Sequence, residues 1–238
     1  LNTAGKFIKN IKAVMRKAVA IGLTDNLAFT NRDFKVIYLA KDHIYLNEQE
    51  LFDLYKLELK GSQEKVRDVF LVACWTGLRY SDLSRLNRDH INRNRIEITT
   101  QKTKGKVKIA LHPVVIEMME KYKYNLPVYT NQHMNRILAE IGPILAENTE
   151  VKVLGPEGVD KSKYDQIKTH TARRSFASNM YRRGDLKPAT IMKITGHRTE
   201  ANFFRYIKVT PDEHADALQK SFERDQELYS NGTTLKAQ

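Results

Sequence analysis

The chain has one cysteine, few glycines and prolines, and no long apolar run. Its 238 residues include Cys74 alone, 11 Gly and 6 Pro. A lone cysteine forms neither an intramolecular disulfide nor a cysteine-based zinc cluster, which favours a reducing, cytoplasmic compartment. The longest apolar stretch, VFLVACW at 69–75, is far shorter than the roughly 20 residues of a membrane-spanning helix. With 41% hydrophobic residues, this composition excludes collagen-like and disordered classes and predicts a folded protein without a membrane partner.

Acidic residues are also scarce. The chain has 28 Asp plus Glu against 40 Lys plus Arg, which gives a formal charge of +12 and a sequence pI near 9.6. Such an excess predicts a polyanionic partner, nucleic acid before a membrane surface. The sequence contains no GxxxxGK[ST], GxGxxG, HExxH, GxSxG or EF-hand pattern. Nucleotide hydrolysis, zinc proteolysis and serine esterase chemistry therefore lack their usual support, and no metal or cofactor is predicted.

A basic helix and a linker are predicted before the main domain. Apolar residues recur at helical spacing over 1–22, and Gly22 stands where the helix would stop. Five basic side chains lie between the apolar ones: Lys6, Lys9, Lys12, Arg16 and Lys17. Since the chain starts at Leu1, with this helix already under way, we expect a piece of a longer protein. We expect the helix and linker to span 1–42, the main domain 43–222, and a polar tail 223–238.

The main domain is predicted to be mainly α-helical with one small antiparallel sheet, an α+β fold. Asn47 and Glu50 have the spacing of a capping box, and a more apolar helix at about 64–76 ends at Gly77. RIEITT and VKIAL alternate on either side of the turn KTKGK, which predicts a β-hairpin. Further helices are expected at about 81–86, 113–122, 131–145, 171–183, 188–194, 200–206 and 211–222.

Four segments concentrate cationic and imidazole side chains, with one tyrosine behind them. They are TGLRYSDL with Arg79 and Asp82, TQKTKGK with Lys102, THTARR with His170 and Arg173, and TGHRTEANFFRY with His197 and Tyr206. Two arginine forks match the non-bridging oxygens of a phosphodiester and would stabilise a pentavalent transition state. A tyrosine beside an imidazole and two arginines gains phenolate character, and its attack would give a phosphotyrosine. A lysine on a hairpin turn could protonate the departing sugar oxygen.

In order and spacing these segments resemble the tyrosine recombinase (phage integrase) family, and the chain is similar to integrases of mobile elements such as conjugative transposons. The resemblance covers about 45–208, and residues 1–22 resemble the last helix of the family's core-binding domain. It implies a complete set of catalytic roles: Tyr206 as nucleophile, Arg79 and Arg173 as phosphate clamp, Lys102 as general acid, His170 as acid/base, His197 as phosphate hydrogen-bond partner and Asp82 as the carboxylate that orients Arg79.

Members of that family cleave one strand of each DNA partner without metal or ATP. They leave a 3′-phosphotyrosine and a free 5′-hydroxyl, and they pass through a Holliday junction within a tetramer. The resemblance therefore implies a site-specific integrase of double-stranded DNA that is a homotetramer in the synaptic complex, with a monomer as one state of the free chain. It also implies accessory DNA-bending or directionality proteins and a cytoplasmic, nucleoid-associated location.

Among the basic residues, several assignments stay open. Lys104, Lys106 and Lys108 share the hairpin with Lys102, so any of them could be the proton donor or a contact to the DNA backbone. Arg174 is expected to face differently from its neighbour and to be dispensable for cleavage. The residues predicted to contact DNA are the five basic residues of the first helix together with Lys104, Lys106 and Arg174.

Tyrosines and histidines outside the motifs are expected to be packing or surface residues. Tyr80, Tyr181 and Tyr229 compete with Tyr206 as nucleophile, and the remaining histidines are His43, His90, His112, His133 and His214. Two other functions stay open. A type IB topoisomerase would use a similar set of residues to relax DNA as a monomer, and a DNA-binding protein of the same fold would not cut at all.

Overall fold

The computed structural model describes residues 2–37, 43–149, 154–155, 158–159, 162–204, 207, 215, 218–219 and 222–223. The chain divides into two compact units, Leu1–His43 and Ile44–Gln238, so the division lies next to the boundary predicted after residue 42. Within the described ranges, no helix has both the length and the apolar character needed to cross a bilayer. The predicted tail 223–238 lies almost entirely outside these ranges.

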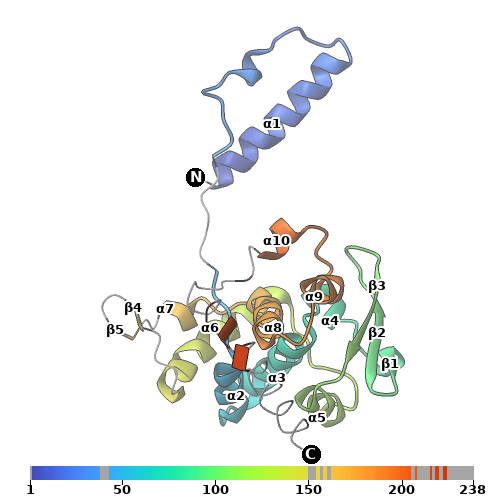
Figure 1. The fold of residues 1–238 in the computed structure, drawn as a ribbon, viewed down its shortest axis with the longest axis vertical. Helices are drawn as coiled ribbons and strands as arrows, with labels where there is room; N and C mark the ends of the chain where they lie inside the picture. The colour runs from blue at the N-terminus through green and yellow to red at the C-terminus, as the bar shows by residue number, and fades with distance from the viewer. Residues whose placement is uncertain are drawn as a thin grey trace, which may run out of the picture. The chain divides into compact units, whose positions relative to one another are not determined.

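The first unit is built on helix α1, Asn2–Ala20, which is followed by the short 3₁₀ helix η1, Ala28–Thr30 (Figure 1). The predicted stop is present: Gly22 has a φ of 73°, and its N–H donates to the carbonyl oxygen of Val19. Gly5 is buried, and a side chain there would collide with the carbonyl oxygen of Ile37. The segment that contains Ile37 therefore lies directly against α1.

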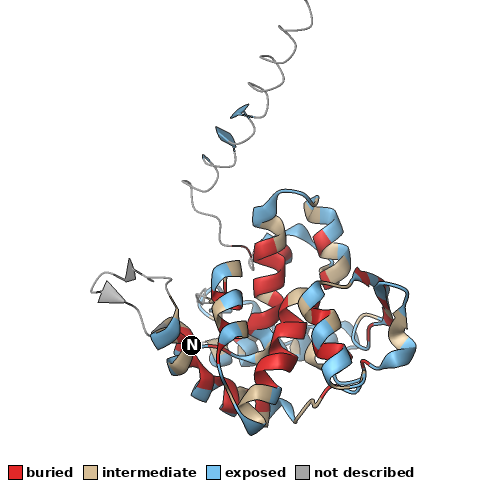
Figure 2. Ribbon diagram, turned by 90° about the horizontal axis from the view of Figure 1, so that it is seen from below, coloured by how far each residue is buried: buried red, intermediate tan, exposed pale blue. Residues whose placement is uncertain are grey.

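The second unit is mainly helical with a small sheet, as predicted. Its helices are α2 (Glu48–Lys56), α3 (Gly61–Thr76), α4 (Tyr80–Leu83), η2 (Arg88–His90), α5 (Pro113–Lys121), α6 (Asn131–Asn148), α7 (Ser162–Asp165), α8 (Thr169–Arg183), α9 (Pro188–Thr195) and α10 (Glu200–Phe204). Helix α3 is the most buried of them and packs against α2, α5, α6 and α8. Figure 2 shows these buried stretches meeting inside the unit. The core therefore surrounds α3.

Local sequence signals explain where the helices begin and end. The predicted capping box is formed: the Asn47 side chain accepts from the Glu50 N–H, and the Glu50 carboxylate accepts from the Asn47 N–H at 2.7 Å. Pro113 and Pro188 occupy first-turn positions, and Gly184 ends α8 with a φ of 74°. The helix predicted at 211–222 lies mostly outside the described residues.

The predicted hairpin is present as two strands of a three-stranded antiparallel sheet. Strands β1 (Ile91–Asn92), β2 (Arg95–Thr99) and β3 (Lys106–Ala110) pair in the order β1-β2-β3. Ile96 pairs with Ile109, Ile98 pairs with Val107, and all four are buried, so alternation sets which face meets the core. A second pair, β4 (Leu154–Gly155) and β5 (Gly158–Val159), was not predicted.

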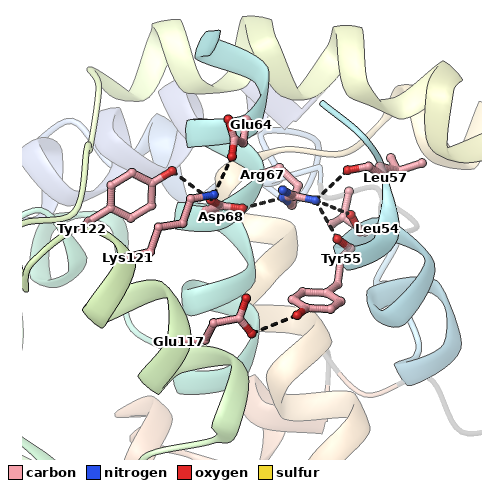
Figure 3. A network of polar contacts seen from close by, with 9 residues as sticks. All are labelled: Leu54, Tyr55, Leu57, Glu64, Arg67, Asp68, Glu117, Lys121 and Tyr122. Carbon is pink, nitrogen blue, oxygen red and sulfur yellow. Dashed lines mark hydrogen bonds and ion pairs between the residues drawn. The ribbon is translucent and has the colours of Figure 1, made fainter. Parts of the chain in front are cut away.

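A buried polar network fixes α3 between its neighbours (Figure 3). Asp68 is fully buried; one carboxylate oxygen accepts from Arg67 at 2.5 Å, and the other accepts from Lys121 at 2.7 Å and Tyr122 at 2.8 Å. Arg67 also donates to carbonyl oxygens at the end of α2, those of Leu54, Tyr55 and Leu57. Burial and the bond to Asp68 raise the pKa of Tyr122 to about 12. The network joins α2, α3 and α5, so the helix that leads to Arg79 is held at both sides.

Candidate active site

Arg79 lies three residues after the end of α3. Helix α3 stops at Gly77, whose φ of 64° is left-handed, and a Cβ added there would lie 2.5 Å from the ring of Phe176. Only glycine meets both conditions without strain. The chain then turns, and Arg79 becomes the N-cap residue of α4. Its guanidinium is partly buried, and Nη2 donates to the carbonyl oxygen of Gly196 at 3.4 Å.

Arg173 points into the interior from α8. The residue is only 3% exposed, and its Nη1 donates to the carbonyl oxygen of Gly77 at 2.5 Å. Arg174 is less buried than its neighbour. His170 lies one turn before Arg173 and is exposed. Because residues three apart share a helix face, His170 and Arg173 belong to the same side of α8.

His197 follows the left-handed Gly196 at the end of α9. Its ring lies with Nδ1 2.8 Å from the Thr195 hydroxyl and packs at 5.6 Å from the ring of Phe203. The pKa of His197 is lowered to about 4, because burial disfavours the imidazolium and the charges of Arg173 and Arg79 repel it. At neutral pH the imidazole is therefore uncharged.

The two arginine contacts cross between motifs. Arg173 donates to the carbonyl of Gly77, two residues before Arg79, and Arg79 donates to the carbonyl of Gly196, the residue before His197. The effect of both guanidinium charges on His197 agrees with this arrangement. Three segments that are far apart in the sequence thus share one positively charged site.

The turn that carries Lys102 borders this site. Lys102 is exposed between β2 and β3, where the hydroxyls of Thr100 and Thr103 lie 2.7 Å apart. A Cβ added to Gly196 would lie 3.5 Å from Thr103 Oγ1 and 3.5 Å from Arg79 Nη1. The hairpin turn and the first arginine therefore both lie close to Gly196.

Asp82 has other partners than the one expected. Its carboxylate is fully buried, and Oδ1 accepts from the backbone N–H of Gln101 at 2.7 Å and from Arg85 at 3.1 Å. Arg85 in turn donates to the carbonyl oxygen of Thr99 at 3.0 Å. Asp82 thus ties α4 to the residue that precedes Lys102, whereas the sequence suggested that it would orient Arg79. Neither Gln101, which lies within the segment TQKTKGK, nor Arg85 had a predicted role.

Tyr206 and its competitor Tyr229 lie outside the described residues. The last described helix before Tyr206 is α10, in which Phe203 is fully buried in a small apolar cluster beside α8 and α9 and Phe204 is 42% exposed. Tyr80 donates its hydroxyl to a backbone carbonyl at 2.8 Å, and Tyr181 packs edge-on against Phe203. Both described competitors therefore have packing roles.

The other described histidines have structural contacts. His112 stacks on Trp75 with ring centroids 3.8 Å apart, and its Nδ1 accepts from the Val114 N–H at the start of α5. Burial and the charge of Arg183 lower the pKa of His112. His90 closes the cap of η2, so these imidazoles act in folding. His214 lies outside the described residues.

Basic side chains extend beyond the arginine pair. Lys104 and Lys106 are exposed on the hairpin, and a groove of about 440 Å³ between β3 and α9 is lined by Lys106, Lys108 and Lys193. Lys193 lies outside the four motif segments, and no DNA contact was predicted for it. On α1, the basic residues are exposed except for Lys12, whose ammonium lies 5.6 Å from the centre of the Phe34 ring.

Comparison with known proteins gives a family match and several similar folds. Residues 45–213 match the sequence model of the Phage integrase family. No curated protein sequence matches the chain. A Tn1549 transposon integrase in complex with circular intermediate DNA has a TM-score of 0.61 and 15% identity, over 90% of this chain and 77% of that one. XerA recombinase has a TM-score of 0.51 and 16% identity, over 89% and 73%. A lambda integrase tetramer bound to a Holliday junction has a TM-score of 0.57 and 15% identity, over 84% and 58%.

Proposed function

We propose, from the premise that this chain belongs to the phage integrase family, that it integrates and excises a mobile DNA element. The family consists of tyrosine recombinases, so the chain is a DNA strand-transferring enzyme. The proposed reaction is site-specific cleavage and rejoining of double-stranded DNA through a 3′-phosphotyrosine, without metal or ATP.

The crossed arginine contacts carry this proposal. Arg79 and Arg173 are each oriented by a hydrogen bond to the backbone of another motif. Oriented guanidinium groups in a partly buried site stabilise charge that develops on phosphate oxygens, because they need little reorganisation during the reaction. The proposed ligand of the pair is the scissile phosphodiester, and the net charge of +12 favours its approach.

The proposed covalent step conserves the bond energy of the backbone. The Tyr206 hydroxyl loses its proton to His170, its oxygen attacks the phosphorus, and the bond to the 5′-oxygen breaks. Lys102 donates a proton to that oxygen, which leaves as a 5′-hydroxyl. Attack of a 5′-hydroxyl from the partner strand reverses these transfers and rejoins DNA, so no nucleotide hydrolysis is required.

His197 and Asp82 support this chemistry in different places. His197 is proposed to hydrogen-bond a phosphate oxygen beside the arginines. Asp82 is proposed to hold the hairpin that carries Lys102, since its carboxylate accepts from the N–H of Gln101. Residues 1–42 are proposed to be the end of a core-binding domain, with the basic residues of α1 against the DNA backbone.

The proposed assembly is a homotetramer on two DNA duplexes. The solved lambda integrase tetramer is bound to a Holliday junction, and the solved Tn1549 integrase is bound to circular intermediate DNA. These similar folds support double-stranded DNA as substrate and a junction as intermediate. DNA-bending and directionality proteins are further proposed partners, and the nucleoid is the proposed place of action.

The test uses a duplex from the ends of the element that carries the gene. The duplex has a nick placed so that the cleaved strand diffuses away. Wild type in EDTA is expected to give a protein–DNA band on a denaturing gel, and Tyr206→Phe is expected to bind the duplex but give no band. A band from Tyr206→Phe, or no band from wild type under conditions of confirmed binding, would contradict the proposal.

A further inference from the structure

The side chains on either side of Gly196, those of Thr195 and His197, form a hydrogen-bonded pair. Thr195 ends α9 and is fully buried, and its Oγ1 lies 2.6 Å from the carbonyl oxygen of Ile191 and 2.8 Å from Nδ1 of His197. Both distances are those of good hydrogen bonds. One hydroxyl therefore bridges a backbone carbonyl and an imidazole nitrogen.

The single hydroxyl proton of Thr195 determines the direction of both hydrogen bonds. The hydroxyl of Thr195 has a single proton, and the carbonyl oxygen of Ile191 can only accept. Donation to the carbonyl four residues earlier is the usual bond of a threonine inside a helix. The proton consequently lies between Thr195 and Ile191, and the bond to His197 must use a proton on Nδ1. The neutral His197 ring then has its lone pair on Nε2.

We propose that Thr195 is a positioning residue that holds His197 in the Nδ1–H tautomer, so that His197 binds a phosphate oxygen only after Nε2 takes up a proton from solvent. The inference rests on the proposed function of His197 as a phosphate partner. A phosphate oxygen can only accept, so a lone pair on Nε2 would repel it. His197 gains one proton when the phosphodiester enters the site and releases it when the phosphodiester leaves.

The surroundings of His197 explain why this proton arrives with the substrate. Among the described residues, the charged groups that act on the ring are Arg79 at the start of α4 and Arg173 on α8, while Phe203 of α10 contributes an apolar face. Both charges are positive, so they oppose a second proton on the imidazole. A phosphodiester between them adds negative charge and reverses that balance.

The first test measures the tautomer without any cleavage. The full chain is labelled with ¹⁵N-histidine, and the signals of His197 are identified by their loss in His197→Gln. At pH about 7, a pH at which an unperturbed imidazole is mostly neutral, Nδ1 is expected to show the shift of a protonated nitrogen and Nε2 that of an unprotonated one. Thr195→Ser should preserve this pattern, and Thr195→Val, which cannot accept, should move the proton toward Nε2. A protonated Nε2 in the wild type, or an unchanged pattern in Thr195→Val, would overturn the proposal.

The second test measures proton uptake through the pH profile. The ratio of single-turnover cleavage rates, wild type over Thr195→Val, is expected to fall by up to about tenfold per pH unit above the pKa of DNA-bound His197, because only the wild type needs the added proton. A ratio that does not vary with pH would overturn the proton-uptake step. Absence of cleavage by every variant would instead contradict the proposed function, while the tautomer result would still stand on its own.

Discussion

Arg173 donates a 2.5 Å hydrogen bond to the carbonyl oxygen of Gly77, a residue that lies 96 positions earlier in the sequence. Gly77 ends the helix that leads to Arg79, so this bond joins the environments of the two arginines. Arg173 is 3% exposed, and the orientation of its guanidinium is set by this bond before any substrate arrives. Such preorganisation is the main way in which a site stabilises developing charge.

Replacing either arginine should therefore affect the rate more than the affinity. For Arg79→Lys and Arg173→Lys we expect the single-turnover cleavage rate at saturating DNA to fall on the order of 100- to 1,000-fold, the range for losing a positioned donor. Affinity should change little, because many other phosphate contacts remain. The matched control is Arg174→Lys, which should cleave at the wild-type rate. Equal losses of rate and affinity would indicate simple anchoring of the DNA.

Gly77→Ala should destabilise the protein more than Gly184→Ala. Both glycines end helices with positive φ, 64° and 74°, but a Cβ at position 77 meets the ring of Phe176 at 2.5 Å, while nothing lies within 4 Å at position 184. We expect a cost of about 1 kcal/mol at Gly184 from the backbone alone. The cost at Gly77 should be about 1–3 kcal/mol larger because the core must shift. Urea unfolding measures both, and equal costs would show that Phe176 yields freely.

Local sequence signals were sufficient to predict much of this fold. The capping box at Asn47, the helix stop at Gly77 and the hairpin around Lys102 each depend on residues within a few positions of one another. Such signals were confirmed because backbone geometry at turns and caps is set by near neighbours. The family motifs added the expectation that Arg79 and Arg173 act together.

The contacts between distant segments could not be predicted in the same way. The bond that Arg79 donates to Gly196 and the bond that Gln101 donates to Asp82 depend on how α4, β2 and α9 pack, and no local pattern encodes that packing. The partner of Asp82 was misjudged because a carboxylate three residues after Arg79 suggested a bond within one helical turn. Tertiary packing turned it toward the hairpin.

Lys102 is expected to be needed only for an oxygen leaving group. The Lys102→Ala variant should cleave a normal duplex more slowly than the wild type. It should cleave a duplex with sulfur at the bridging 5′ position at nearly the wild-type rate, because a thiolate leaves without protonation. Lys104→Ala, Lys106→Ala and Lys108→Ala are the matched controls and should show no such selective rescue. Rescue of one of these in place of Lys102 would move the general acid to that residue.

Acid should destabilise the wild type relative to His197→Gln. The pKa of His197 is about 4 in the folded protein against 6.5 when unperturbed. Between these values the unfolded chain binds more protons, so the free energy of unfolding of the wild type must fall as pH is lowered from 6.5 toward 4. Above 6.5 the two proteins should differ by a constant amount. Urea unfolding at several pH values tests this, and a difference that stays constant into acid would contradict the lowered pKa.

The most direct test of the account is the identity of the residue that becomes bonded to DNA. Adduct trapped on the nicked duplex would be digested with trypsin and nuclease, and the nucleotide-bearing peptide sequenced by mass spectrometry. Since Arg205 and Lys208 are the flanking trypsin sites, the account predicts the modified peptide 206–208, with the phosphate on Tyr206. A phosphate on the peptide 175–182, which contains Tyr181, or on any other tyrosine would contradict it.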